Sequence, residues 1–260
     1  MTALTLSPPA KVNLGLFIQG KQANGYHLLE TLLFPVPELR DQLTVYQREQ
    51  EQPTLDLSNV QLDGDPQDNL CLKAWRALKQ VVPDLPAVHI ELRKHIPAGA
   101  GLGGGSSDAA YTLRALNRLL ELGLSTEELH PIAAQLGADV PFFLYDQPML
   151  ASGTGTDLRP FDLPHRFRLH VYPQPIHSST IAAYKALDYT QFDPQRDLSA
   201  VLSGPLTDWP SHLHNDLEVP VFAMYPELAQ LKKDLYAQGA LYAAMSGSGS
   251  AMLALWPEEG

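Results

Sequence analysis

The segment from residue 97 to residue 110 contains the residue types that most strongly indicate chemistry. It reads Pro97-Ala98-Gly99-Ala100-Gly101-Leu102-Gly103-Gly104-Gly105-Ser106-Ser107-Asp108-Ala109-Ala110, so five of the seven residues from 99 to 105 are glycine. Glycine costs backbone entropy in a regular helix or strand. A glycine run between a predicted strand and a predicted helix therefore favours a loop whose backbone N–H groups bind a phosphate at the positive end of the helix dipole. The alternative is a flexible surface loop without a ligand.

Two other phosphate-loop patterns fit this sequence poorly. Gly99, Gly101 and Gly104 have the spacing of the dinucleotide-binding fingerprint, but no repeated strand–helix–strand unit surrounds them. Residues 15–21 nearly match a P-loop, but Gln22 stands where Ser or Thr would bind magnesium. We discard the P-loop and keep the dinucleotide fingerprint as a weak alternative.

Lys11 is an isolated cation between apolar neighbours in a predicted strand. A lysine there could stabilise negative charge that develops during a reaction. It could also lie in solvent, with only its alkyl chain on the protein surface. Asn13 lies two residues further on, so its side chain is expected on the same face of the strand.

Asp139 is a candidate general base. It is flanked by Ala138 and Val140, and Pro141 and two phenylalanines follow. These apolar neighbours would raise the pKa of the carboxyl group by removing water, whereas a nearby cation would lower it. The sequence leaves that balance open, and the segment on its own favours a cap at the end of a helix.

Several elements are expected to position these residues. Alternating apolar residues predict strands within the first 35 residues and at 88–92, and residues 41–60 are also expected to be extended. Asp68 or Asn69 is expected to cap a helix that ends near residue 81, and Ser125 with Glu128 forms a capping box for a helix that ends near residue 137. The two serines and Asp108 are expected to start a further helix, with Ser107 as one candidate N-cap. The other predicted elements are a turn at 22–25, helices at 179–187 and 226–238, and a strand at 169–171. Residues 243–255 are predicted to form a loop that enters a buried strand.

The predicted strands and helices mix without a regular alternation. This order favours an α+β fold over a doubly wound parallel sheet. The segment 147–160 carries prolines and glycines and is the most plausible domain boundary. We therefore expect two domains, residues 1–150 and residues 151–260.

Composition excludes several classes of protein. The chain has 260 residues, with 18 Lys and Arg against 29 Asp and Glu, so its formal charge is −11. That charge argues against a nucleic-acid scaffold and against binding to an anionic membrane. Cys71 is the single cysteine, which excludes an internal disulfide and a cysteine-based zinc site and fits a reducing cytoplasm. We expect a cytoplasmic protein with no secretory signal and no membrane span.

The motifs together resemble the GHMP kinases, the superfamily named after galactokinase, homoserine kinase, mevalonate kinase and phosphomevalonate kinase. The glycine-rich segment resembles their phosphate loop, and Ser-Gly-Ser-Gly-Ser at 246–250 resembles their third motif. Residues 9–14, 137–143 and 215–218 are similar to one family within the superfamily, whose substrate is 4-diphosphocytidyl-2-C-methyl-D-erythritol. Gly25-Tyr26-His27 resembles the cytidine-binding signature of that family, and the other GHMP kinases have no cytosine to bind. The similar segments extend from residue 9 to residue 255, nearly the whole chain.

The resemblance implies a two-domain GHMP kinase fold of the α+β class, in which mixed sheets pack with helices and the active site lies in the interdomain cleft. It implies transfer of the γ-phosphate of ATP to the 2-hydroxyl group of the cytidylated alcohol, a step of the non-mevalonate isoprenoid route. ATP and Mg²⁺ are the implied cofactors, without a dedicated metal site in the protein. The expected partners are these small molecules, with no nucleic acid and no membrane, and the expected state is a monomer or weak homodimer.

The resemblance also implies roles for individual residues. Asp139 is the implied base or orienting group for the hydroxyl, and Lys11 is its implied electrostatic partner. The residues implied to bind ATP are Asn69, Lys94, Pro97, Gly99, Gly101, Leu102, Gly103, Gly104, Gly105, Ser106 and Ser107.

The substrate contacts implied by the resemblance lie elsewhere in the chain. Asn13 is implied to bind the methylerythritol hydroxyls. Tyr26 and His27 are implied to hold the cytosine, with Tyr184 on its other face. An aromatic ring supplies the stacking surface that such a base needs.

One segment departs from the family pattern. Residues 151–156, Ala-Ser-Gly-Thr-Gly-Thr, stand where the family has an Arg and a Glu around the second glycine, so we assign no charged role there. His212 and His214 lack a third ligand at suitable spacing and are assigned no metal. The alternative functions are another GHMP kinase, a nucleotide-binding regulator without catalysis, and a dehydrogenase.

Overall fold

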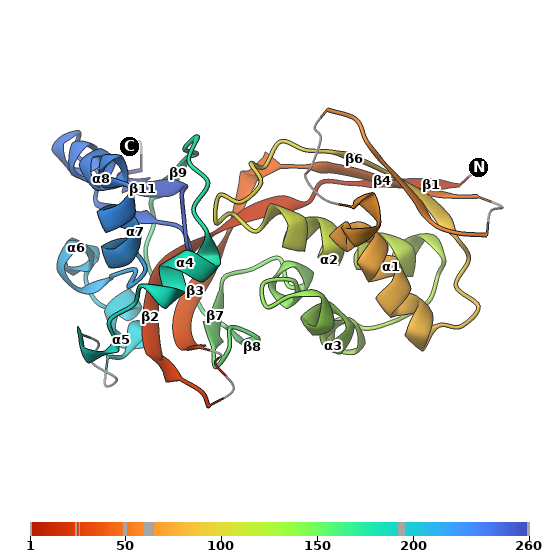
Figure 1. The fold of residues 1–260 in the computed structure, drawn as a ribbon, viewed down its shortest axis with the longest axis horizontal. Helices are drawn as coiled ribbons and strands as arrows, with labels where there is room; N and C mark the ends of the chain where they lie inside the picture. Colours follow the sequence, from red (N-terminus) through yellow and green to blue (C-terminus); the bar gives the residue numbers. More distant parts are fainter. Residues whose placement is uncertain are drawn as a thin grey trace. The chain divides into compact units, whose positions relative to one another are not determined.

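The computed structural model describes residues 2–23, 25, 27–48, 51–59, 65–191 and 196–258 (Figure 1). The chain divides into two compact units, each built from separate stretches of sequence. Unit 1 comprises Met1–Ala10, Val36–Ala98 and Gly103–Asp146, and unit 2 comprises Lys11–Pro35, Gly99–Leu102 and Gln147–Gly260. The sequence domains 1–150 and 151–260 stay a prediction, since the units are defined by packing and not by contiguous sequence.

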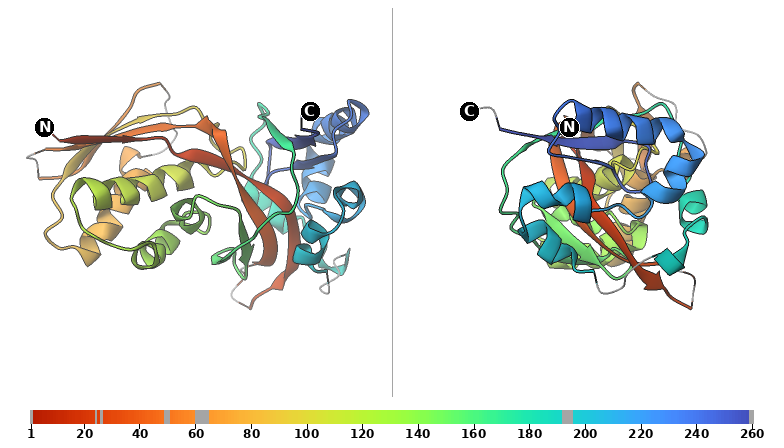
Figure 2. Two further views of the ribbon diagram at one scale, coloured as in Figure 1. Left: turned by 180° about the vertical axis from the view of Figure 1, so that it is seen from behind. Right: turned by 90° about the vertical axis from the view of Figure 1, so that its left-hand side faces the viewer.

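Unit 1 consists of a four-stranded sheet with helices packed on it. Strand β5 pairs with β6 in parallel, and the other neighbours in the order β1-β4-β6-β5 are antiparallel. Helix α2 packs against β1 and β4, and α1 packs against α2 and α3; two opposite views show these helices on the same side of the sheet (Figures 1 and 2). The elements of unit 1 are β1 (Ala3–Leu6), β4 (Gln42–Gln47), β5 (Thr54–Leu57), η1 (Pro66–Asp68), α1 (Leu70–Val81), β6 (Val88–Arg93), α2 (Gly104–Leu119), α3 (Thr126–Leu136) and η2 (Pro141–Leu144).

The helix ends in unit 1 follow local capping chemistry. Asn69 Oδ1 accepts a hydrogen bond from Cys71 N, which confirms the predicted start of α1. Ser125 and Glu128 form the predicted capping box of α3. Helix α2 starts earlier than predicted, because Gly103 and not Ser107 is its N-cap.

Unit 2 contains two further sheets and short helices. One sheet has the order β2-β3-β7-β8, and the other has the order β10-β11-β9 with antiparallel neighbours. The first residues of β2 and the last residues of β3 belong to unit 1. The elements are β2 (Pro9–Lys21), β3 (His27–Arg40), β7 (Met149–Ser152), β8 (Asp157–Pro160), β9 (Arg168–Tyr172), α4 (Thr180–Lys185), η3 (Tyr189–Gln191), α5 (Leu198–Ser203), η4 (Leu206–Asp208), α6 (Trp209–His212), α7 (Glu218–Met224), α8 (Pro226–Ala237), β10 (Tyr242–Met245) and β11 (Met252–Trp256).

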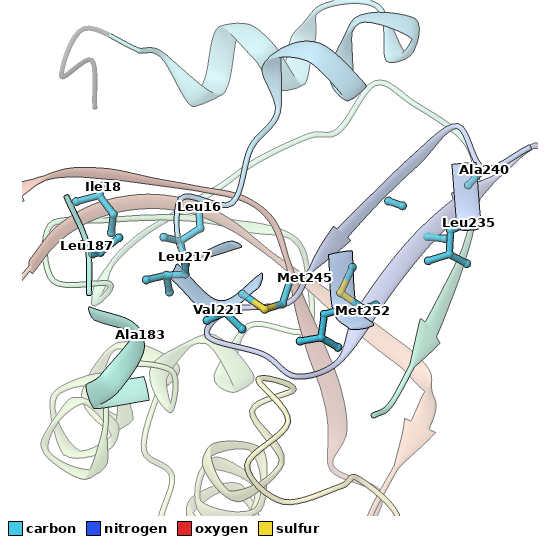
Figure 3. Close-up of a cluster of buried hydrophobic side chains, with 13 residues drawn as sticks. Leu16, Ile18, Ala183, Leu187, Leu217, Val221, Leu235, Ala240, Met245 and Met252 are labelled. Atoms are coloured by element: carbon cyan, nitrogen blue, oxygen red, sulfur yellow. The ribbon is translucent and has the colours of Figure 1, made fainter. Parts of the chain in front are cut away.

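A hydrophobic cluster joins several elements of unit 2 (Figure 3). Leu16 and Ile18 from β2 contribute to it together with Val221 from α7 and Met245 and Met252 from β10 and β11. Each of these side chains is at most 3% exposed. Because burial of apolar area stabilises a fold by about 25 cal/mol per Å², the cluster fixes β2 against the C-terminal strands and helices of the same unit.

The α+β class is confirmed, and most predicted elements are present. Strands β6 and β9 and helices α4 and α8 lie within two residues of their predicted bounds. Gly25 N donates to Gln22 O at 2.9 Å, so the predicted turn is present, although Asn24 and Tyr26 lie outside the described residues. In the part of the chain that the structure describes, no helix has the length and apolar character needed to cross a membrane.

Gly101 supplies a stability test of the packing in unit 2. Its φ is +76°, and a Cβ there would overlap the carbonyl oxygen of Ser246. Gly239, also in unit 2, has φ +97° but no atom within 4 Å of the Cβ position. Alanine at either position incurs about 1–2 kcal/mol for the left-handed backbone, and Gly101→Ala adds about 1–3 kcal/mol of steric strain.

We therefore expect Gly101→Ala to lower the free energy of unfolding clearly more than Gly239→Ala, as measured by urea denaturation of both variants and the wild type. Equal losses in the two variants would show that the close approach of Gly101 to Ser246 is not a constraint.

Candidate active site

Helix α2 has an N-terminus that could hold an anion. Its N-cap residue, Gly103, has φ +70° and, being glycine, has no side chain with which to cap the helix. Ser107 N donates to Gly103 O at 2.8 Å, so the N–H groups of Gly104, Gly105 and Ser106 precede the first intrahelical bond. Such N–H groups and the helix dipole together make a phosphate-binding site.

Two buried oxygen atoms lie in the first turns of α2. Ser107 Oγ and Asp108 Oδ1 have no hydrogen-bond partner among the described residues. A buried polar atom without a partner is costly unless a ligand, ion or water satisfies it. Nearby, a Cβ on Gly104 would lie 2.9 Å from Ile96 Cγ2, so the backbone there is closely packed. The residues at this helix terminus therefore fit a phosphate group.

Lys94 is held between two carboxylates. Its Nζ donates to Asp41 Oδ2 and, at 2.6 Å, to Asp108 Oδ2, and the lysine side chain is 9% exposed. Asp41 Oδ1 also accepts from the backbone N–H groups of His95 and Ile96. Two of the three ammonium protons of Lys94 thus point to carboxylates, and its predicted contact with ATP stays a prediction.

The shared lysine shifts the titration of its partners. Burial lowers the pKa of Lys94, but the two carboxylates outweigh burial and leave that pKa above its ordinary value. Burial raises the pKa of Asp108 to about 7, because Lys94 lowers it only in part and the like charge of Asp41 raises it further. Lys94 therefore offsets the effects of burial and of the Asp41 charge on the pKa of Asp108 only in part.

Asp139 lies in the turn between α3 and η2 and is half-buried. Gly137 is the C-cap of α3 and Val140 the N-cap of η2, so the helix-cap alternative for Asp139 is wrong. Val140 and the phenylalanines that follow are buried, as the apolar segment predicts. In the same unit, Asn69 uses its Oδ1 to cap α1.

Lys11 is buried in unit 2, where its side chain forms part of a polar chain. It is 3% exposed, so the solvated-lysine alternative is wrong. Its Nζ donates to Asn13 Oδ1 at 2.7 Å, which confirms that the two side chains share a face of β2. Asn13 Nδ2 in turn donates to Thr31 Oγ1 on β3 at 2.9 Å.

The loop after β10 is hydrogen-bonded to the start of the glycine-rich segment. Ser246 Oγ donates to Gly101 O at 2.9 Å, and Lys11 N donates to Leu102 O at 3.0 Å. A Cβ on Gly247 would lie 3.6 Å from Lys11 Nζ. Three segments of unit 2 that are distant in sequence therefore meet around Lys11.

The other predicted ATP contacts are spread over both units. Gly99, in unit 2, has φ +67°, and a Cβ there would lie 2.9 Å from His177 Nδ1. Pro97 and Ser106, in unit 1, are half-buried, and Gly105 is exposed. In the described part of the chain, these residues determine the shape of the glycine-rich segment, and their contacts with ATP stay a prediction.

The predicted cytosine contacts are packed against one another. The His27 ring lies 4.4 Å from the Tyr184 ring, centroid to centroid, and 5.9 Å from the nearly parallel Tyr189 ring. His27 Nε2 is buried and has no hydrogen-bond partner among the described residues. Burial and the nearby charge of Lys21 lower the pKa of His27, so the imidazole is neutral at pH 7. With the rings 4.4 Å apart, a base could not lie between His27 and Tyr184 unless they separate.

Comparison with known proteins places the chain in a family. Residues 69–147 match the model of the GHMP kinases N terminal domain, and residues 198–260 match that of the GHMP kinases C terminal domain. The 4-diphosphocytidyl-2-C-methyl-D-erythritol kinases of Bacteroides fragilis strain YCH46 and Porphyromonas gingivalis strain ATCC 33277 are 41% and 42% identical to the chain over 256 and 255 residues, each covering 97% of this chain and 92% of the relative. The chain belongs to this kinase family.

A solved structure of a 4-(cytidine 5′-diphospho)-2C-methyl-D-erythritol kinase agrees with this assignment. It has a TM-score of 0.81 and 36% sequence identity to the chain, and the match covers 97% of this chain and 90% of the solved one. The two-domain GHMP kinase fold implied by the sequence motifs is therefore confirmed.

Three side chains that hydrogen-bond to or beside candidate site residues were not themselves predicted as site residues. Asp41 holds Lys94, and Thr31 holds Asn13. Asn215, from a segment that looked family-like but had no assigned role, donates through Nδ2 to the carbonyl oxygens of Met245 and Gly247, at 2.8 Å in each case. All three act through contacts between distant parts of the chain, and only Asn215 had a sequence signal that could have found it.

The kinase's buried Lys94 group gives a pH-dependent stability test. Because the pKa of Asp108 is raised in the folded state, its protonated form stabilises the fold below about pH 4, and that stability is lost as pH rises toward about 7. Asp108→Asn keeps the shape of the side chain without the titration. Relative to wild type, the variant should therefore gain roughly 1.4 kcal/mol per pH unit across this window.

Urea denaturation of both proteins between pH 4 and pH 8 measures this difference. A stability difference that is constant over the whole range would contradict the raised pKa of Asp108.

Proposed function

We propose that the chain transfers the γ-phosphoryl group of ATP to the 2-hydroxyl group of 4-diphosphocytidyl-2-C-methyl-D-erythritol. The observation that carries this proposal is the buried Lys11–Asn13 pair, which is hydrogen-bonded to the start of the glycine-rich segment in a chain of this kinase family. The reaction belongs to the non-mevalonate route to isoprenoid precursors. The expected partners are ATP and this one class of alcohol.

The proposal assigns the nucleotide phosphates to the glycine-rich segment and the start of α2. Gly103 leaves the first N–H groups of the helix without a side-chain cap, which supports phosphate binding there. Mg²⁺ bound with ATP would neutralise phosphate charge, and Ser106 and Ser107 are the hydroxyl residues proposed to face it. Ser107 Oγ, which has no hydrogen-bond partner within the described residues, supports that assignment.

Phosphoryl transfer depends mainly on positioning and charge stabilisation. We assign Asp139 to the hydroxyl, which it would orient or deprotonate, and Lys11 to the negative charge that develops on the transferred group. Asn13 would bind the methylerythritol hydroxyls. The burial of Lys11 supports its role, since a charge in a water-poor environment interacts more strongly with its target.

The proposal assigns the cytosine to His27 together with Tyr26 and Tyr184. Aromatic rings around His27 provide stacking surfaces. Nε2 of its neutral imidazole has no hydrogen-bond partner in the part of the chain that the structure describes, and it could bond a pyrimidine edge. Because His27 and Tyr184 are in contact, we propose that binding of the base separates the two rings.

Variants of Asp139 test the catalytic assignment. Asp139→Asn should lower kcat by about 10²–10⁴-fold, because a positioned acid or base typically contributes that much. The dissociation constant for ATP should change little, since the proposal assigns ATP to other residues. Asp162→Asn, at an exposed carboxylate, is the matched control.

Steady-state ADP release in the presence of the cytidylated alcohol and equilibrium binding of ATP measure the two quantities. An unchanged kcat in Asp139→Asn would remove Asp139 from the mechanism. Equal turnover with mevalonate or homoserine would instead overturn the assigned substrate.

Variants of His27 test the substrate assignment. Stacking of a base on an aromatic side chain is worth about 1–3 kcal/mol, so His27→Ala should raise KM for the cytidylated alcohol by about 5- to 150-fold. His27→Phe keeps an aromatic ring and should raise this KM less. His212→Ala, at an exposed histidine, is the control. KM for ATP should stay the same in all three. An increase in KM for ATP alone would show that His27 serves the other substrate.

A further inference from the structure

Thr31 is buried on β3 and its hydroxyl is hydrogen-bonded on two sides. It is 3% exposed. Thr31 Oγ1 donates to Gly15 O at 2.6 Å and accepts from Asn13 Nδ2 at 2.9 Å. All three residues belong to unit 2, and Asn13 is the residue that accepts a hydrogen bond from Lys11.

The proton count fixes the direction of these bonds. A threonine hydroxyl has one proton, and a carbonyl oxygen can only accept. The proton of Thr31 must therefore go to Gly15 O, which leaves a lone pair that requires a donor. Asn13 satisfies it only by presenting its NH₂ group.

The orientation of Asn13 then determines what Lys11 meets. An ammonium group is a donor with no acceptor capacity. With its NH₂ group turned to Thr31, Asn13 must turn Oδ1 to Lys11, as the 2.7 Å contact has it. The reversed amide would place N–H groups against the ammonium and a carbonyl oxygen against the lone pair of Thr31.

The Gly15 carbonyl, which ends this series of hydrogen bonds, is also fixed in place. Gly15 has φ +72°, and a Cβ there would lie 2.5 Å from Leu213 Cδ1. Glycine is therefore the residue that fits this backbone conformation and packing. The series of hydrogen bonds thus begins at a rigid carbonyl and leads to the lysine. It runs from Gly15 O through the Thr31 hydroxyl and the Asn13 amide to the Lys11 ammonium.

We propose that Thr31 is a positioning residue for the kinase reaction and acts on Lys11 through Asn13. The inference depends on the function proposed above. Thr31 touches no substrate in this account. It sets the one amide orientation in which Asn13 holds the lysine, and ATP binding at the glycine-rich segment does not require it.

Removal of the hydroxyl at position 31 tests this role. Thr31→Val keeps the size and branching of the side chain, and Thr31→Ala covers the case in which valine fails to fold. We expect kcat to fall by about 10- to 100-fold, the size of effect expected when a buried polar group loses its hydrogen-bond partner, with KM for ATP unchanged. Thr31→Ser restores the hydroxyl and should recover most of kcat.

Thr112→Val is the matched control. Thr112 is fully buried in α2 and donates to Asp108 O at 2.7 Å, so the change removes a hydroxyl bonded to a backbone carbonyl in the same way. This threonine takes no part in the series of hydrogen bonds that links Gly15 O, through Thr31 and Asn13, to Lys11. Its kcat should stay close to that of wild type.

A double-mutant cycle with Asn13 separates positioning from general damage. If Thr31 acts through Asn13, Thr31→Val should lower kcat strongly in the wild type but less than about twofold in an Asn13→Ala background. The same loss of kcat in both backgrounds, or no loss in either, would overturn the proposal.

An NMR measurement distinguishes failure of the Thr31 proposal from failure of the proposed function. The Asn13 side-chain NH₂ signals of ¹⁵N-labelled protein should shift and exchange faster with solvent in Thr31→Val than in wild type and Thr31→Ser. If the wild type transfers no phosphate, the proposed function fails, and unchanged NH₂ signals would separately show that Thr31 does not orient Asn13.

Discussion

A buried ammonium group tolerates few arrangements of its neighbours, and three segments of unit 2 meet around the one on Lys11. Transfer of a charge out of water is costly unless hydrogen bonds replace its hydration. Asn13 supplies one of these bonds, and its own amide is oriented by Thr31. The same few residues bond to the start of the glycine-rich segment and to Ser246. Misplacement of any one of these neighbours would therefore disturb the lysine.

Unit 1 contains a second lysine with little exposed side chain, and its charge is stabilised in a different way. Lys94 is paired with Asp41 and Asp108, so its charge is compensated by carboxylates inside the protein. Burial raises the pKa of Asp108, and the like charge of Asp41 raises it further, because Lys94 offsets these effects only in part. This cluster lies beside the N-terminus of α2 and sets the backbone after β6, since Asp41 also binds the N–H groups of His95 and Ile96. The two carboxylates explain why Lys94, a basic residue next to the glycine-rich segment, has a side chain that is only 9% exposed.

Local chemistry made much of the fold predictable from the sequence. The caps at Asn69 and Ser125 and the alternation in β6 depend on residues within a few positions of each other. The start of α2 was misplaced because glycine has low helix propensity, yet Gly104 and Gly105 lie within its first turn. Motif resemblance found the candidate site residues, whereas Asp41 and Thr31 became visible only in three dimensions. Their partners lie 53 and 18 residues away, and no local pattern encodes such contacts.

The reaction proposed for this chain moves a phosphoryl group from ATP to the 2-hydroxyl group of the cytidylated alcohol. Phosphorus-31 NMR of a mixture of the protein, Mg²⁺, ATP and 4-diphosphocytidyl-2-C-methyl-D-erythritol follows every phosphorus atom directly. The account predicts one new phosphomonoester signal that grows in step with ADP, while the diphosphate signals of the alcohol remain paired. Release of inorganic phosphate without a new phosphomonoester, or no change in the spectrum, would contradict it.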